Sequence, residues 1–172
     1  MRRYVILAFL CAPWPLAGQS PRSAAPPWIL TPGTAPALAL PKALRGSLAA
    51  DLEYDSADVI HGVAIDLNSD QQVDFIIQSA PSLCGNGGCQ YEVVNGATQA
   101  IVGEIGGVAV VILPSRDHSF LRLATYTHEG AGTGMYTLYS FNGRAYEPTV
   151  QRALTQPAQD SLVAAWHVIP GW

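Results

Sequence analysis

The chain has 172 residues, of which 49% are hydrophobic and only 13% are charged, and its formal net charge is −4. So little charge combined with so much apolar content excludes an intrinsically disordered chain. The acidic balance argues against nucleic-acid binding, which uses a basic surface. A chain of this length suits one folded domain with a single core.

The N-terminus has the pattern of an export signal. Residues 1–3 supply two arginines, residues 4–12 are apolar, and prolines and small residues follow. The apolar run is too short to span a bilayer comfortably, and a cleavage context of small residues lies between Ala17 and Ser20. We therefore predict a signal peptide over residues 1–18. The protein is expected to be periplasmic or secreted, with no membrane span after cleavage.

Three further segments follow the signal. Residues 19–41 contain six prolines among alanine, serine and threonine. Such a segment has little to bury and keeps an extended backbone, so we predict a Pro/Ala-rich linker. A β-rich domain is expected over residues 42–150, and a C-terminal extension over residues 151–172.

The pattern after residue 41 is mostly that of strands. Residues 42–52 approximate helical spacing and predict a short N-terminal helix. Alternation of apolar and polar residues, or short β-branched runs, predict strands over residues 63–67, 73–77, 91–94, 99–102, 108–113, 120–126 and 135–141. We expect a two-residue Asn95-Gly96 turn, a strand end at Pro114 and a final short helix over residues 160–166. The fold class is therefore mainly β: a single small antiparallel β-domain, either a sandwich or a partly open barrel.

The loop between the first two of these strands has the spacing of a cation-binding loop. Oxygen-bearing groups recur at every second position, as the side chains of Asp66, Asn68, Asp70 and Asp74 and the backbone carbonyl of Gln72. Hard oxygen ligands at this spacing suit a single Ca²⁺ ion, which is the cofactor we predict. An EF-hand is excluded, because its twelfth loop position is Ile77 in place of glutamate and the flanks are strands.

One position departs from the usual calcium loop. The sixth residue, normally a glycine because the turn needs a positive φ, is Gln71. A side chain there costs on the order of 1 kcal/mol and is expected to lower the affinity for the ion. The alternative is a hairpin loop without metal, in which Asp66 and Asn68 accept hydrogen bonds from backbone amides.

The cysteines fit an exported protein. Cys11 lies within the predicted signal, so the mature chain keeps Cys84 and Cys89, an even pair for an oxidising compartment. Four residues separate them, which differs from the two-residue spacing of redox-active pairs. We predict a structural disulfide that fixes the shape of the glycine-rich loop between them.

Charge is unevenly distributed along the chain. Residues 46–115 contain no lysine or arginine but nine aspartates and glutamates, whereas the signs balance from Arg116 onward. This asymmetry favours cations or a basic protein partner, and a merely solvated acidic surface is the alternative. We assign no catalytic residue and no organic cofactor, because the His-Glu-x-x-His and Gly-x-Ser-x-Gly patterns are absent.

The motifs together resemble a known family. The loop over residues 66–74, the Cys-Gly-Asn-Gly-Gly-Cys segment at 84–89, the Leu-Pro-Ser-Arg segment at 113–116 and the Phe-Asn-Gly-Arg-Ala-Tyr hairpin at 141–146 resemble a family of uncharacterised exported proteobacterial proteins. The loop alone also resembles the calcium loops of FG-GAP and dockerin modules, which recur on unrelated folds. We predict an exported, non-enzymatic binding or inhibitor module. The alternative is a small periplasmic hydrolase with a site of Asp, Glu and His residues.

Overall fold

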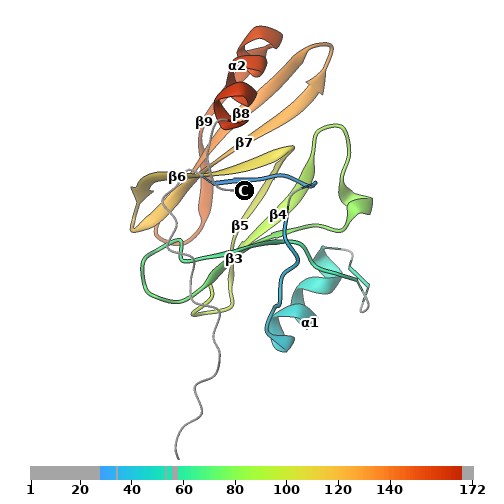
Figure 1. The fold of residues 1–172 in the computed structure, drawn as a ribbon. Coiled ribbons are helices and arrows are strands. Elements are labelled where there is room, and N and C mark those ends of the chain that lie inside the picture. The colour runs from blue at the N-terminus through green and yellow to red at the C-terminus, as the bar shows by residue number, and fades with distance from the viewer. Residues whose placement is uncertain (1–27, 34, 53, 56–57, 168–172) are drawn as a thin grey trace, which may run out of the picture.

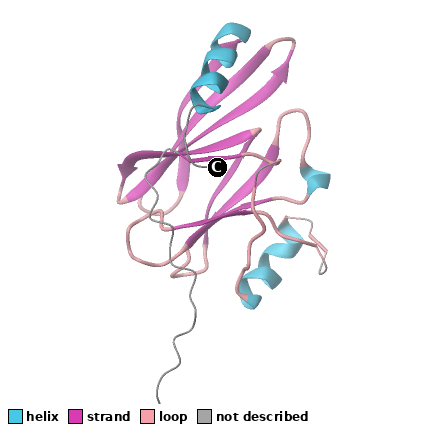
Figure 2. Cartoon of the chain, in the orientation of Figure 1, coloured by secondary structure: helices cyan, strands magenta, loops and turns pink. Residues whose placement is uncertain are grey.

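The computed structural model describes residues 28–33, 35–52, 54–55 and 58–167, and the predicted signal peptide lies outside these ranges. The chain is mainly β, which confirms the predicted fold class (Figures 1 and 2). Its elements in chain order are β1 (Trp28–Leu30), α1 (Lys42–Asp51), β2 (Gly62–Ile65), β3 (Asp74–Gln78), the 3-10 turn η1 (Pro81–Leu83), β4 (Cys89–Val94), β5 (Ile101–Gly107), β6 (Ala109–Asp117), β7 (Phe120–Gly130), β8 (Thr133–Phe141), β9 (Tyr146–Thr155) and α2 (Gln156–His167).

The strands form two sheets that pack face to face. One sheet has the order β1-β6-β7-β8-β9 and the other the order β2-β3-β4-β5. Every described strand pair is antiparallel. Most neighbours in a sheet are also neighbours in the chain, so short hairpin loops build most of the structure. The result is an open sandwich, the first of the two architectures expected from the sequence.

The main core lies between the two sheets. Because side chains alternate across a strand, every second residue of β3, β4, β6 and β7 points inward. Ile76, Tyr91, Val110 and Leu123 are each no more than 1% exposed and belong to one cluster. At one end of this core, Phe120 stacks on Phe141 and meets the edge of Tyr146.

Helix α1 covers part of the outer face of the four-stranded sheet. Leu44, Leu48 and Leu52 recur every four residues, so they share one side of the helix or lie just beyond its end. They form a second core cluster with Phe75, Ile77 and Val94 of the sheet. The helix predicted over residues 42–52 is therefore confirmed.

Several boundaries differ from the sequence-based expectation. β1 lies in the segment predicted to be a linker and pairs with β6, and β9 continues past residue 150 to Thr155. β6 continues through Pro114, because the ladder with β7 is interrupted between Ile112 and Arg116 and no amide of residue 114 is needed there. α2 is longer than the helix expected over residues 160–166.

The β4–β5 connection also differs from the expected two-residue turn. Val94 pairs with Ile101, so six residues form the loop. Asn95 organises it, since its backbone amide donates to the carbonyl of Ala100 and its side-chain oxygen accepts from the amide of Thr98. Gly96 is therefore free to contact another part of the chain.

Within the described ranges, no helix is long and apolar enough to cross a membrane.

Candidate functional site

The loop of residues 66–74, here called the acidic loop, connects β2 to β3 and is anchored at its second residue. Leu67 is fully buried in the main core. Its carbonyl accepts hydrogen bonds from the backbone amide of Leu121 at 2.8 Å and from the Arg116 guanidinium at 2.9 Å. The loop is thus attached to the β6–β7 hairpin of the opposite sheet, and its polar part projects from a fixed base.

Asp66 organises the first half of the acidic loop. One of its carboxylate oxygens accepts the amide of Ser69 at 2.6 Å and that of Asn68 at 3.3 Å. The other accepts the amide of Gln71 at 3.0 Å. A carboxylate that accepts several amides in this way winds the following residues around itself.

Asn68 and Asp70 continue the same pattern. The amide of Asp70 donates to Oδ1 of Asn68 at 2.9 Å, and the amide of Gln72 donates to Oδ1 of Asp70 at 2.7 Å. The side-chain amide of Asn68 also donates to Oδ2 of Asp70 at 2.9 Å. The structure therefore brings Asp66, Asn68 and Asp70 together on the inside of one turn, with Gln72 engaged through its backbone amide.

Two residues of the loop have positive φ. Ser69 has φ 63° and Gln71 has φ 69°, both in the left-handed region. Gln71 is the position at which the sequence predicts a need for glycine, and the structure shows the positive φ that makes this need real. Its side chain costs on the order of 1 kcal/mol in this conformation.

Asp74 has a different role from the other acidic residues. It is 0% exposed, and its two oxygens accept amides from Leu67 at 2.9 Å and from Gly96 at 2.9 Å. Burial raises the pKa of Asp74 to about 6; the Gly96 and Leu67 amides oppose this rise, and nearby Asp70 and Asp66 reinforce it. Asp74 thus closes the loop from within and joins it to the β4–β5 connection.

The described part of the chain contains no cluster of three or more His, Cys, Asp or Glu side chains placed to hold a metal. The predicted ligand set therefore divides into two parts. Asp66, Asn68 and Asp70 share one turn, whereas Asp74 is fully buried and accepts the amides of Leu67 and Gly96. Each carboxylate oxygen has two lone pairs, so one oxygen of Asp66 and both oxygens of Asp70 can each accept one more ligand, whereas the other oxygen of Asp66 already accepts two amides.

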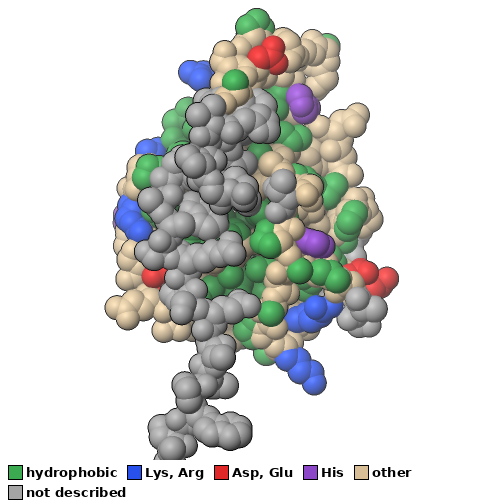
Figure 3. All heavy atoms as spheres, viewed as in Figure 1, with side chains coloured by type: hydrophobic (Ala, Val, Ile, Leu, Met, Phe, Trp, Pro, Cys, Tyr) green, Lys and Arg blue, Asp and Glu red, His purple; other side chains and the backbone are tan. Residues whose placement is uncertain are grey.

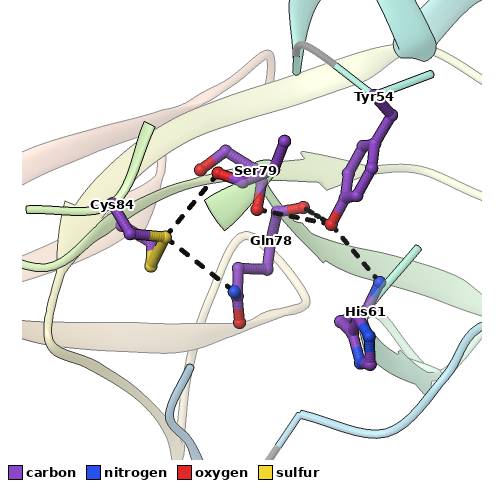
Figure 4. Close-up of a disulfide and its surroundings, with 7 residues drawn as sticks. Tyr54, His61, Gln78, Ser79 and Cys84 are labelled. Carbon is purple, nitrogen blue, oxygen red and sulfur yellow. Dashed lines mark hydrogen bonds between the residues drawn. A yellow bond between two sulfur atoms is a disulfide. The ribbon is translucent and has the colours of Figure 1, made fainter. Parts of the chain in front are cut away.

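The predicted disulfide is present. Cys84, which directly follows η1, and Cys89, the first residue of β4, are joined with an S–S distance of 2.03 Å. Figure 4 shows the side chain of Gln78 directed toward Cys84, while Tyr54 donates to the carbonyls of Gln78 at 2.8 Å and Ser79 at 3.3 Å. The bridge therefore lies beside the end of β3, where the segment after α1 is attached.

The described histidine side chains lie on separate elements. His61 contacts the carbonyl of Ala35, and His128 contacts the hydroxyl of Tyr126. His118 lies 3.1 Å from Asp117 on the β6–β7 turn, where the His118 side chain is 60% exposed and that of Asp117 47%. The structure brings none of these three histidines together.

Another polar feature was missed by sequence reasoning. Glu92 of β4 and Glu104 of β5 lie directly opposite each other and line a hollow beside α1. Twelve positions separate them in the chain, so only the register of the two strands makes them neighbours. The long stretch without basic residues was the only sequence feature that pointed to an acidic surface here, and it did not distinguish Glu92 and Glu104 from the other acidic residues. On the face drawn in Figure 3, charged side chains are few and scattered, as the low charged fraction implies.

The chain was compared with known proteins in three ways. No protein-family model, no curated protein and no solved structure matches it. The resemblance to an exported proteobacterial family therefore stays a prediction from the motifs.

Proposed function

We propose that this protein is an exported, non-enzymatic binding or inhibitor module in which the acidic loop binds Ca²⁺. The observation that carries the calcium part is the joint orientation of Asp66, Asn68 and Asp70 inside one turn, held by the loop's own amides. A ligand set organised in advance needs little ordering when the ion binds. The carbonyl of Gln72 is the fourth ligand in this proposal.

Electrostatics supports a cation at this position. Asp66, Asp70 and Asp74 lie within nine consecutive residues, and no lysine or arginine occurs between residues 46 and 115. Asp66 and Asp70 both act to raise the pKa of buried Asp74, which means that the negative charges of the three side chains repel one another. A divalent ion would offset this mutual repulsion. In this arrangement Asp74 supports the loop from below through its two amide contacts.

The binding role is favoured over the hydrolase alternative. Hydrolysis by a His–carboxylate pair needs the pair in a cavity that also holds the substrate. The Asp117–His118 pair lies on an exposed turn, and its histidine also contacts the carbonyl of Phe141. The acidic stretch instead suits a basic protein partner in the periplasm or outside the cell, which is the localisation we propose from the N-terminal pattern.

Thermal melting with added ions tests the calcium part. We expect Ca²⁺ to raise the melting temperature, Mg²⁺ to do so less, and a chelator to reverse the shift, because an ion that binds only the folded state stabilises it. Asp70→Ala should abolish the shift. Asp117→Ala, which removes an exposed aspartate outside the loop, should retain it. An unchanged melting temperature in millimolar Ca²⁺ would falsify the calcium part.

The partner is tested by affinity capture from a periplasmic extract, with and without chelator. We expect basic proteins to be enriched on the immobilised chain and to elute with salt. Equal retention of acidic and basic proteins would contradict a charge-directed binding role.

A further inference from the structure

A hollow of about 490 Å³ lies on the outer face of the four-stranded sheet, next to the C-terminal end of α1. The residues that shape it on its open side come from β4, β5 and the position that follows α1. They are Leu52, Gln90, Glu92, Ile101, Glu104 and Gly106. The hollow is separate from the acidic loop, which lies between β2 and β3.

The hollow exists because α1 covers only part of this face. The leucines of α1 pack on Phe75 and Ile77 of β3 and on Val94 at the end of β4. Beyond Val94, the outward positions of the β4–β5 ladder are the pairs Glu92–Glu104 and Gln90–Gly106. Gly106 has no side chain, so the space opposite Gln90 is left unfilled and forms part of the hollow.

The two glutamates give the hollow its charge. Directly opposed residues on one face of an antiparallel pair have Cβ atoms about 5 Å apart, and like charges at this distance repel. Glu92 is only 6% exposed, whereas Glu104 is exposed. A positive group placed between them would interact with both carboxylates in a partly desolvated position, where charge interactions are stronger than in water.

The remaining lining is apolar on one side. Leu52 is buried at the end of α1, and Ile101 is 41% exposed at the start of β5. Lysine and arginine combine a hydrocarbon stem with a charged end, so one such side chain can satisfy apolar and acidic walls at once. A bare metal ion would use the carboxylates and leave the apolar wall uncovered.

We propose that this hollow receives a lysine or arginine side chain of a protein partner, with the charged end between Glu92 and Glu104 and the stem against Leu52 and Ile101. This inference rests on the proposed function only in taking the partner to be a basic protein. It places the recognition site on the β4–β5 face and makes it independent of calcium in the acidic loop.

The test uses the disulfide-bonded protein and a short fluorescent peptide of alternating alanine and lysine. A matched peptide with norleucine in place of lysine keeps the stems and removes the charge. We expect the lysine peptide to bind with a salt-dependent affinity, and the norleucine peptide at least tenfold more weakly. Glu104→Gln and Glu92→Gln should each weaken binding of the lysine peptide about tenfold. Glu147→Gln, an exposed glutamate on the other sheet, is the matched control and should bind like the parent protein.

A steric variant tests the same site without changing its charge. A Cβ atom at Gly106 would meet only the carbonyl oxygen of Cys89, at 3.8 Å, so Gly106→Leu is expected to fold and to fill the hollow. We expect it to lose the lysine peptide while its melting temperature stays close to that of the parent protein.

Three results would overturn the proposal. Two of them are an unchanged affinity for the lysine peptide in Glu104→Gln or in Gly106→Leu. The third is displacement of the lysine peptide by Ca²⁺ from the parent protein but not from Glu104→Gln, which would identify an ion site. Asp70→Ala separates this proposal from the calcium proposal. It should lose the calcium-dependent thermal shift and still bind the lysine peptide.

Discussion

The carboxylate of Asp74 accepts the backbone amide of Gly96 at 2.9 Å and thereby joins two loops that are 22 residues apart in the chain. The other oxygen of Asp74 holds the amide of Leu67. One buried side chain therefore fixes the acidic loop to the β4–β5 connection. An ion or partner that moved the acidic loop would therefore have to break the hydrogen bonds that Asp74 accepts from Leu67 and Gly96.

Gly96 is expected to tolerate no side chain. A Cβ atom there would lie 1.7 Å from the carbonyl oxygen of Val73, so Gly96→Ala must displace the β4–β5 loop and break the contact with Asp74. We expect a loss of about 3 kcal/mol in the free energy of unfolding, measured with urea. Gly85→Ala is the control, because a Cβ atom there meets nothing within 4 Å. Similar stabilities of the two variants would show that the loops are not held together as described.

Stability should depend on pH through Asp74. Its carboxyl group has a pKa of about 6 in the folded protein and an ordinary value of 3.8, so the folded state binds the proton more tightly. Ionisation of this group therefore opposes folding. Its contribution is most favourable below about pH 4, falls as the pH rises toward 6, and is level above that, with a total change of about 3 kcal/mol.

Asp74→Asn isolates this effect, because an amide cannot ionise. We expect the difference in unfolding free energy between the parent protein and Asp74→Asn to change with pH between 4 and 6, as measured by urea unfolding across this range. Asp160→Asn, on α2, is the control and should follow the parent protein. Parallel pH profiles of the parent and Asp74→Asn would contradict the raised pKa.

Gln71→Gly should stabilise the protein and improve calcium binding together. Glycine adopts the observed φ of 69° without the steric cost of a side chain, so we expect a gain of about 1 kcal/mol and a lower Kd for Ca²⁺. Chemical unfolding and calcium titration by calorimetry measure the two effects. Gln72→Gly, next to it and outside the positive-φ positions, should lose stability instead. A destabilised Gln71→Gly would show that the loop does not need this conformation.

Removal of the disulfide should cost modest stability. The bridge closes a loop of only a few residues, so the unfolded chain gains little freedom when Cys84 and Cys89 are replaced by serine, and we expect a loss of about 2 kcal/mol. Thermal melting of the double variant, compared with the disulfide-bonded parent protein, measures this loss. Loss of all folded structure would show that the bridge does more than fix its own loop.

Local patterns predicted the elements that depend on nearby residues. Leu44, Leu48 and Leu52 gave the helix because their spacing alone puts them on one side, and alternation gave the strands. The disulfide followed from an even pair of cysteines. β1 could not be predicted, since three residues among prolines carry little signal and their pairing with β6 is remote in sequence.

The candidate site was predictable only as a set of residues. Asp66, Asn68 and Asp70 lie on one turn because each of their contacts is between residues that are close in the chain, and their role as calcium ligands stays a prediction. Asp74 has the right spacing for a ligand, but its burial depends on Gly96, which the spacing cannot reveal. The opposition of Glu92 and Glu104 likewise depends on a strand register that is set by the whole hairpin.

β9 has a consequence for how partners can approach. It ends the order of the larger sheet, and residues 147–153 are all exposed, so its outer backbone is the natural place for a strand of another molecule to add. Pro148 has no amide hydrogen to offer, and the ladder with β8 shifts register next to it. Both features discourage edge-to-edge pairing and aggregation. In the binding role proposed above, contacts with a partner are therefore expected through side chains, without a partner strand pairing with β9.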